Sequence, residues 1–193
     1  MPNLHATALD ERFSSLGTIL ISGDQIQSRV RELGAQISRD YAGTVPILVT
    51  VLRGGVLFLA DLMRAIDIDH EIDFMAVSSY GKETQSSGVV RILSDLNMNI
   101  QGRDVLIVED IVDTGLTLAY IRENLETRQP ASLRICALLD KKARRATSVR
   151  VEYVGFEIPD KFVVGYGLDF AERHRNLPHI VALNETASGP AER

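Results

Sequence analysis

The apolar residues of the chain follow two different spacings. Short runs rich in β-branched residues predict buried strands, and these cover 46–51, 72–77, 104–108, 133–139, 162–166 and 180–183. Apolar positions three or four residues apart predict helices at about 24–40, 56–64 and 116–128. Ser22 and Gln25 have the spacing of a capping box, which predicts the start of the first helix.

Strands and helices alternate through the middle of the chain. This order predicts an α/β fold with a mainly parallel central sheet that is covered by helices on both faces. The 193 residues contain no internal repeat and no linker rich in Pro, Gly and Ser, so we expect one domain with a core at about 19–183. The polar segment 184–193 is expected to fray. Because ligands of such folds bind beyond the carboxyl ends of the strands, the residues after each strand are the candidates for function.

Composition and charge narrow the classes of partner. The net charge of −5 disfavours a general electrostatic attraction to nucleic acid. The first ten residues lack the basic and apolar regions of a signal peptide, and no apolar run approaches the ~20 residues of a membrane span. We therefore expect a cytoplasmic protein without a membrane partner. Cys136 is the single cysteine and lies in an apolar run, which predicts a buried thiol and no disulfide.

Segment 105–117 carries the clearest chemical pattern. An apolar strand is followed by two adjacent carboxylates, Glu109 and Asp110, and then by a turn that leads into a helix. The hydroxyl and N–H groups of such a turn suit a phosphate, whereas two carboxylates suit the hydroxyl groups of a sugar. The turn has neither a lysine nor the spacing of a nucleotide triphosphate loop. The pattern favours a pentose that carries a phosphate.

This segment resembles the phosphoribosyl-diphosphate motif of type I phosphoribosyltransferases. From about residue 19 to 183, the chain resembles the hypoxanthine-guanine phosphoribosyltransferases more narrowly. The resemblance implies the fold of that family, in which terminal segments form a small hood. It also implies transfer of a 5-phosphoribosyl group from phosphoribosyl diphosphate to N9 of a 6-oxopurine, with Mg²⁺ as cofactor. A homodimer or homotetramer is implied as well.

The resemblance gives each residue of the motif a role. Asp113 is implied to be the general base or proton acceptor at purine N7, and Glu109 and Asp110 are implied to hold the ribose hydroxyls. The 5-phosphate would be bound by backbone amides and hydroxyls of Thr114, Gly115, Leu116 and Thr117. Some family members carry Lys where this chain has Leu116, so the amides and hydroxyls must bind the phosphate without it.

Two further segments match the parts of the family that bind diphosphate. The pyrophosphate loop, whose second residue follows a cis peptide in the family, is matched by Leu52, Arg53 and Gly54. Arg175 matches an arginine that faces the diphosphate. The implied ligands of Mg²⁺ or its waters are Glu109, Asp110 and Asp169.

The segments that match the base site select a 6-oxopurine enzyme. Lys141 resembles the lysine that reaches the 6-oxo group, and a lysine can donate to a carbonyl oxygen but not to an amino group. Phe162 resembles the aromatic that stacks on the base, and Val163 the residue whose backbone reads the Watson–Crick edge. Ser79 and Tyr80 begin a polar stretch, 82–88, that resembles the lid over the reacting centre.

The sequence leaves alternatives open. It does not separate a preference for hypoxanthine, guanine or xanthine. Some proteins of this fold are RNA-binding regulators of pyrimidine synthesis, but the net charge of −5 and the Lys141 and Phe162 segments argue against that function. A binding module without catalysis would be expected to have lost Asp113 or the carboxylate pair at 109–110, and all three are present.

Overall fold

A six-stranded sheet lies at the centre of the computed structural model, which describes residues 16–79 and 90–184. The strand order is β4-β3-β2-β5-β6-β7. These strands are β2 (Ile47–Leu52), β3 (Glu71–Ser79), β4 (Val90–Ser94), β5 (Asp104–Val112), β6 (Ser132–Asp140) and β7 (Tyr153–Glu157). Each neighbouring pair is parallel except β3 and β4, which are antiparallel. The expected mainly parallel sheet is therefore confirmed.

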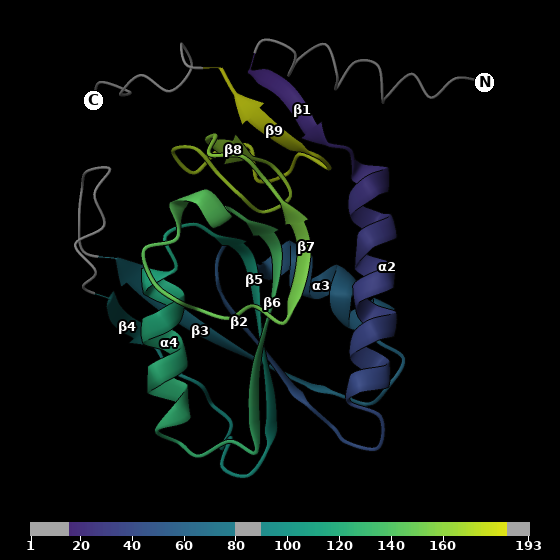
Figure 1. The fold of residues 1–193 in the computed structure, drawn as a ribbon, viewed down its shortest axis with the longest axis vertical. Helices are drawn as coiled ribbons and strands as arrows, with labels where there is room; N and C mark the ends of the chain where they lie inside the picture. The colour runs from purple at the N-terminus through teal and green to yellow at the C-terminus, as the bar shows by residue number, and fades with distance from the viewer. Residues whose placement is uncertain (1–15, 80–89, 185–193) are drawn as a thin grey trace.

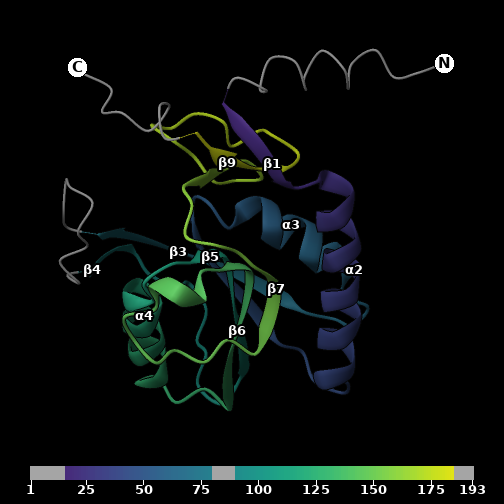
Figure 2. The same cartoon turned by 45° about the horizontal axis from the view of Figure 1, so that its top comes forward.

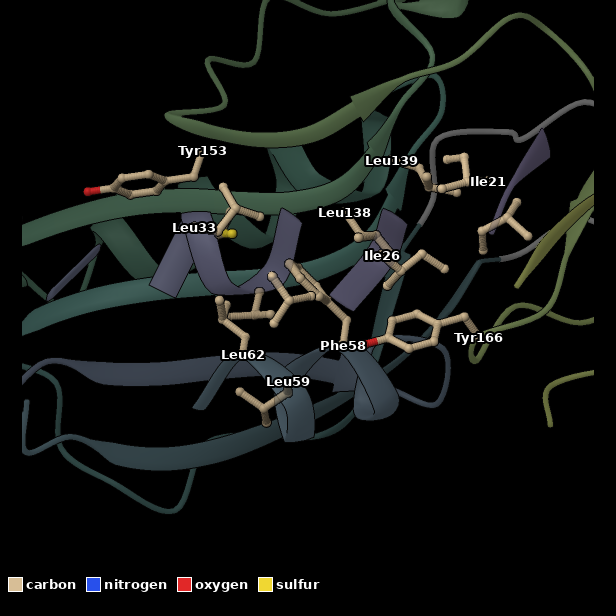
Figure 3. Packing of buried hydrophobic residues seen from close by; sticks show 14 of the residues in the cluster. Ile21, Ile26, Leu33, Phe58, Leu59, Leu62, Leu138, Leu139, Tyr153 and Tyr166 are labelled. Carbon is tan, nitrogen blue, oxygen red and sulfur yellow. The ribbon is translucent and has the colours of Figure 1, made fainter. Parts of the chain in front are cut away.

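Helices cover both faces of this sheet, with α2 (Gly23–Asp40) and α3 (Val56–Ala65) on one face and α4 (Leu116–Glu126) on the other (Figure 1). Successive residues of β5 alternate between the two sides, as the period of a strand requires. Leu106 and Val108 pack in the cluster of α2 and α3, whereas Val105 and Ile107 pack in the cluster of α4. Figure 3 shows the first cluster, in which side chains of α2 and α3 interdigitate.

The start of α2 follows the sequence prediction closely. The Gln25 N–H donates to Ser22 Oγ at 3.2 Å, and the Ser22 N–H donates to Gln25 Oε1 at 2.8 Å, so the capping box is formed. Cys136 is fully buried, as its apolar surroundings predict. No helix in the described ranges is long and apolar enough to cross a membrane.

A small hood stands above the carboxyl ends of the strands of the central sheet (Figure 2). It is an antiparallel sheet of β1 (Gly17–Ile21), β9 (Ile180–Leu183) and β8 (Val163–Val164), in the order β1-β9-β8. The paired strands β1 and β9 come from opposite ends of the described chain, as the hood implied by the resemblance requires. The Tyr166 hydroxyl donates to Asp61 Oδ2 at 2.6 Å, which ties the hood to α3.

Three details differ from the expectations. β5 continues to Val112, so Glu109 and Asp110 lie within the strand and not after its end. The strand expected at 162–166 is limited to Val163–Val164, because the next residues, Gly165 and Tyr166, have φ of 102° and 49°, which no strand can continue. β1, β4 and β7 were not anticipated from the apolar pattern.

Candidate active site

Two adjoining cavities lie where the carboxyl ends of the strands meet the hood. The larger, of about 640 Å³, is lined by the turn after β5, the loops after β2 and β6, and the hood. The smaller, of about 220 Å³, lies at the start of α4 and shares Asp113, Thr114 and Thr117 with the larger one. Segments that are far apart in the sequence thus line two neighbouring cavities that share residues of the turn after β5.

The smaller cavity faces an anion-binding helix start. Gly115 precedes α4 with φ of 81°, a left-handed conformation that glycine adopts without a steric penalty. Because glycine has no side chain, the first N–H groups of the helix receive no side-chain cap from this position. The Leu116 N–H makes a long contact of 3.4 Å with Thr114 Oγ1. N–H groups and hydroxyls arranged in this way can bind a phosphate.

Glu109 and Asp110 are half-buried neighbours in β5 and therefore point to opposite sides of the strand. Glu109 lines the smaller cavity and Asp110 the larger. Burial raises the pKa of Glu109 well above its usual range, and the charge of Asp110 raises it further. Burial also raises the pKa of Asp110 to about 6, although the Ile111 N–H donates to its Oδ1 at 2.7 Å. Both carboxylates are thus short of compensating charge in the ligand-free protein.

The loop after β2 approaches Asp110 very closely. A Cβ at position 54 would lie 1.7 Å from Asp110 Oδ2, so Gly54 is required for this contact. The peptide between Leu52 and Arg53 is cis, as in the pyrophosphate loop that the segment resembles. The loop therefore places its backbone beside a carboxylate that lines the larger cavity.

One end of the larger cavity holds a cluster of charged side chains around the buried Lys141. The Lys141 N–H donates to Val112 O at 2.9 Å, which fixes Lys141 beside the end of β5. Its side chain is 6% exposed, and its Nζ lies 3.7 Å from Asp113 Oδ2 and 3.8 Å from Asp160 Oδ1. Arg144 Nε lies 3.2 Å from Asp113 Oδ1, and Arg144 Nη1 lies 3.6 Å from Asp160. Lys141 is thus not part of a solvated basic surface.

An exposed aromatic ring and open backbone groups face this same end. Phe162 is 50% exposed and lines the cavity, while the edge of Phe170 packs against it with ring centroids 5.5 Å apart. The Leu183 N–H donates to Phe162 O, so Val163, opposite Ala182, occupies a non-hydrogen-bonded position. Because β8 is an edge strand, the N–H and C=O of Val163 point toward the open side.

The other end of the cavity carries two arginines. Arg175 Nη1 donates to Gly167 O at 2.7 Å, and Arg175 Nη2 lies 2.7 Å from Asp169 Oδ1. Arg53 Nη1 and Arg175 Nη2 both donate to Glu172 Oε2, at 2.9 Å and 3.2 Å. The hydrogen bond from Arg175 and the charge of Arg53 lower the pKa of Glu172.

Most of the site residues expected from the sequence surround these cavities. The larger cavity is lined by Arg53, Gly54, Asp110, Asp113, Thr114, Thr117, Lys141, Phe162, Val163, Asp169 and Arg175, and the smaller adds Glu109 and Gly115. Leu52 and Leu116 line neither of them. Ser79 ends β3, while Tyr80 and the expected lid at 82–88 lie outside the described residues.

Sequence reasoning missed three charged residues at the site. Arg144 and Asp160 join the cluster around Lys141, and Glu172 joins the two arginines. The signal that could have found two of them was their closeness in sequence to expected site residues, because Arg144 follows Lys141 by three residues and Asp160 precedes Phe162 by two. Their contacts connect separate segments, so no local pattern could assign them.

The carboxylates of the larger cavity have the chemistry of a magnesium site that is completed by a substrate. Within residues 16–79 and 90–184, no group of three or more His, Cys, Asp or Glu side chains could hold a metal alone. Asp110 and Asp169 line the same cavity, and the charge of Asp169 contributes to the raised pKa of Asp110, after burial. Mg²⁺ is usually bound by one or two carboxylates together with water and substrate phosphates. The residues therefore fit an ion that arrives with a phosphorylated substrate.

Comparisons with known proteins identify the family of the chain. Residues 22–171 match the family model for the phosphoribosyl transferase domain. A hypoxanthine-guanine phosphoribosyltransferase from Mycobacterium avium is 54% identical over 173 residues, which cover 86% of this chain and 85% of the relative. The Bacillus subtilis protein of the same name is 52% identical over 165 residues, which cover 86% of this chain and 92% of the relative.

The fold is similar to solved structures of the same kind. A crystal structure of a hypoxanthine phosphoribosyltransferase from Staphylococcus aureus matches with a TM-score of 0.89 and 45% identity, covering 93% of this chain and 98% of that one. The sequence match and the fold match therefore each cover most of the chain. The chain belongs to the phosphoribosyltransferase family and, within it, to the hypoxanthine-guanine phosphoribosyltransferases.

Proposed function

We propose that this protein is a purine salvage enzyme that makes IMP or GMP. It transfers the 5-phosphoribosyl group of phosphoribosyl diphosphate to N9 of hypoxanthine or guanine and releases diphosphate. The observation that carries this proposal is the division of one cavity into a base end, with Lys141 and Phe162, and an arginine end, with Arg53 and Arg175. The helix start beside it supplies a separate place for the 5-phosphate.

The base end has the donors and acceptors that a 6-oxopurine needs. Phe162 offers an exposed ring face for stacking, and the backbone of Val163 offers one donor and one acceptor for the Watson–Crick edge. Lys141 donates to the 6-oxo oxygen. Adenine has an amino group at this position, so a buried ammonium would meet a second donor.

Asp113 acts on the proton of the base. The base presents N9 to the sugar carbon while N7 carries a proton, and the N9–C1 bond forms as the bond from C1 to the diphosphate oxygen breaks. Asp113 accepts the N7 proton, and its negative charge offsets the positive charge that develops on the base and the sugar. Glu109 and Asp110 hold the ribose hydroxyls in place during this step.

We assign Asp110 and Asp169 to Mg²⁺ or its waters, together with Glu109, which precedes Asp110 in β5. Bound there, the ion would neutralise charge on the diphosphate leaving group. Arg175 and the backbone of the Arg53 loop orient that group. Thr114, Thr117 and the amides between them hold the 5-phosphate, so both ends of the donor are fixed.

The test of this function is a magnesium-dependent ultraviolet assay with phosphoribosyl diphosphate. Hypoxanthine, guanine, xanthine and adenine are compared as acceptors. We expect turnover with hypoxanthine or guanine and none with adenine, and the ratios give the preference among the oxopurines. Absence of turnover with every purine would contradict the proposal, and RNA binding would then be measured.

Removing Lys141 should weaken binding of the base. In Lys141→Ala we expect the KM for hypoxanthine to rise about tenfold to a hundredfold, because a hydrogen bond from a charged donor contributes roughly 1.5–3 kcal/mol. The KM for phosphoribosyl diphosphate should change little. Lys142→Ala is the matched control, since Lys142 is an exposed neighbour paired with Glu157. Equal changes in the two variants would contradict the role of Lys141.

We propose that the enzyme works in the cytoplasm as a homodimer or homotetramer. The location is supported by the buried, unpaired thiol of Cys136, which suits a reducing compartment. Light scattering on the purified protein would measure the assembly, and a monomer at micromolar concentration would contradict it.

A further inference from the structure

A group of four charged side chains at the arginine end is neutralised internally. Arg53 and Arg175 both donate to the same oxygen of Glu172, and Arg175 is also paired with Asp169. Arg53, Asp169 and Arg175 line the larger cavity, whereas Glu172 contacts them from its edge. The side chains of Arg53 and Glu172 are 72% and 67% exposed, so this pair can separate without opening the fold.

The backbone holds Glu172 in a conformation that L-residues rarely adopt. Ala171, Glu172 and His174 have φ of 50°, 62° and 73°, all in the left-handed region. The Glu172 N–H donates to Asp169 Oδ2 at 2.9 Å, which fixes this turn against the cavity. Such conformations persist where surrounding contacts enforce them, and they cluster at functional sites. The turn presents one carboxylate to both arginines, whose other carboxylate partner at the cavity is Asp169, paired with Arg175.

We propose that Glu172 tunes binding of the donor, because its carboxylate occupies the arginines that the diphosphate takes when it binds. This inference rests on the proposed function. The Glu172 oxygen accepts hydrogen bonds from two guanidinium groups, as a phosphate oxygen also can. Diphosphate carries more charge and more oxygens than one carboxylate, so it displaces Glu172 toward solvent. Glu172 therefore lowers the affinity for the donor and for the diphosphate product, and it speeds release of that product.

The test is Glu172→Gln, which keeps the shape of the side chain and removes its charge. We expect the KM for phosphoribosyl diphosphate and the inhibition constant of diphosphate each to fall about threefold to fivefold, the upper part of the range for an exposed ion pair, because Glu172 contacts two arginines. The KM for hypoxanthine should not change. Glu157→Gln is the control because Glu157 is an exposed carboxylate paired with Lys142, and the net charge changes equally. It should leave all three constants as in the wild type.

Each outcome decides the inference. A donor KM in Glu172→Gln that is unchanged or higher would overturn the inference. A higher KM would mean that Glu172 holds the arginines in place for the donor. Glu172→Asp, which keeps the charge, should return the constants toward wild-type values. Calorimetric binding of magnesium diphosphate separates this inference from the proposed function. If Glu172→Gln binds diphosphate more tightly but the wild-type protein shows no turnover, only the proposed function is contradicted. If the wild type turns over normally but the variant binds diphosphate as the wild type does, only this inference is contradicted.

Discussion

Replacing Asp113 by asparagine should lower kcat by about a hundredfold to ten-thousandfold, the usual contribution of a positioned acid or base. The amide cannot take the N7 proton, and it carries no charge to offset the positive charge of the reacting sugar. The KM for phosphoribosyl diphosphate should stay within a few-fold of the wild type, because the phosphate turn keeps its backbone. Steady-state kinetics with saturating hypoxanthine would measure both constants.

Asp160→Asn provides the matched control for this variant. Asp160 belongs to the same cluster, with Lys141 Nζ at 3.8 Å and Arg144 Nη1 at 3.6 Å, and its replacement removes the same charge. If the charge of the cluster alone mattered, both variants would lose kcat equally. A kcat in Asp113→Asn that equals the wild-type value would contradict the assignment of Asp113 as proton acceptor.

The two ends of the cavity share one electrostatic arrangement. At the base end, Lys141 and Arg144 face Asp113 and Asp160. At the arginine end, Arg53 and Arg175 face Asp169 and Glu172. In each cluster two cations face two carboxylates, so the positive charge at either end already has partners within the protein. A substrate that binds at either end must therefore displace carboxylates of the protein from these cations, because the cations are already paired.

The parts of the fold that the sequence predicted are those with a strong apolar period. In α2, the spaced residues Ile26, Val30, Leu33 and Ile37 are all buried, and the helix ends at Asp40 as expected. The edge strand β4 has no such pattern, because most of its residues are exposed, including the apolar Leu93, at 60%. The predicted end of β5 was too early, because a carboxylate is energetically costly in a half-buried strand. A role in binding a ligand explains why β5 nevertheless contains Glu109 and Asp110.

The candidate site was predictable where a motif is continuous in sequence. The turn at 113–117 and the Lys141, Phe162 and Asp169 segments could each be recognised by their own residues, and the fold brings them to the cavities. The contacts of Arg144 with Asp160 and of Arg53 with Glu172 join residues that are 16 and 119 positions apart. Contacts of this kind depend on the completed fold, so spacing along the chain does not reveal them.

The position of Asp110 leads to a prediction about stability as well as activity. Its pKa is raised from 3.8 to about 6, chiefly by burial, so the folded protein holds this proton more tightly than the unfolded chain. Protonated Asp110 therefore stabilises the fold. That contribution is complete below about pH 4 and is lost as the pH rises through about 6. Above pH 6 the ionised group costs the empty protein about 1–3 kcal/mol, at 1.36 kcal/mol for each pKa unit.

Asp110→Asn should accordingly stabilise the protein while it inactivates the enzyme. In a chelator and without donor, we expect Tm at pH 7.5 to rise by about 3–8 °C, since 1 kcal/mol corresponds to roughly 2–4 °C for a chain of this size. At pH 4 the two proteins should melt almost together. Turnover should fall because the carboxylate that faces Gly54 and the ribose is gone. Calorimetric melts across pH 4–8, together with the ultraviolet assay, would measure both effects.

Asp95→Asn is a control in which the sign of the effect is reversed. Burial alone would raise the pKa of Asp95, but hydrogen bonds from Arg128 and the Leu96 N–H, with the charge of Arg128, outweigh it and lower the pKa. The ionised form of Asp95 therefore stabilises the fold above its unfolded pKa, and Asp95→Asn should lower Tm slightly at pH 7.5. A fall of Tm in Asp110→Asn at that pH would mean that the charge of Asp110 is already compensated in the empty site.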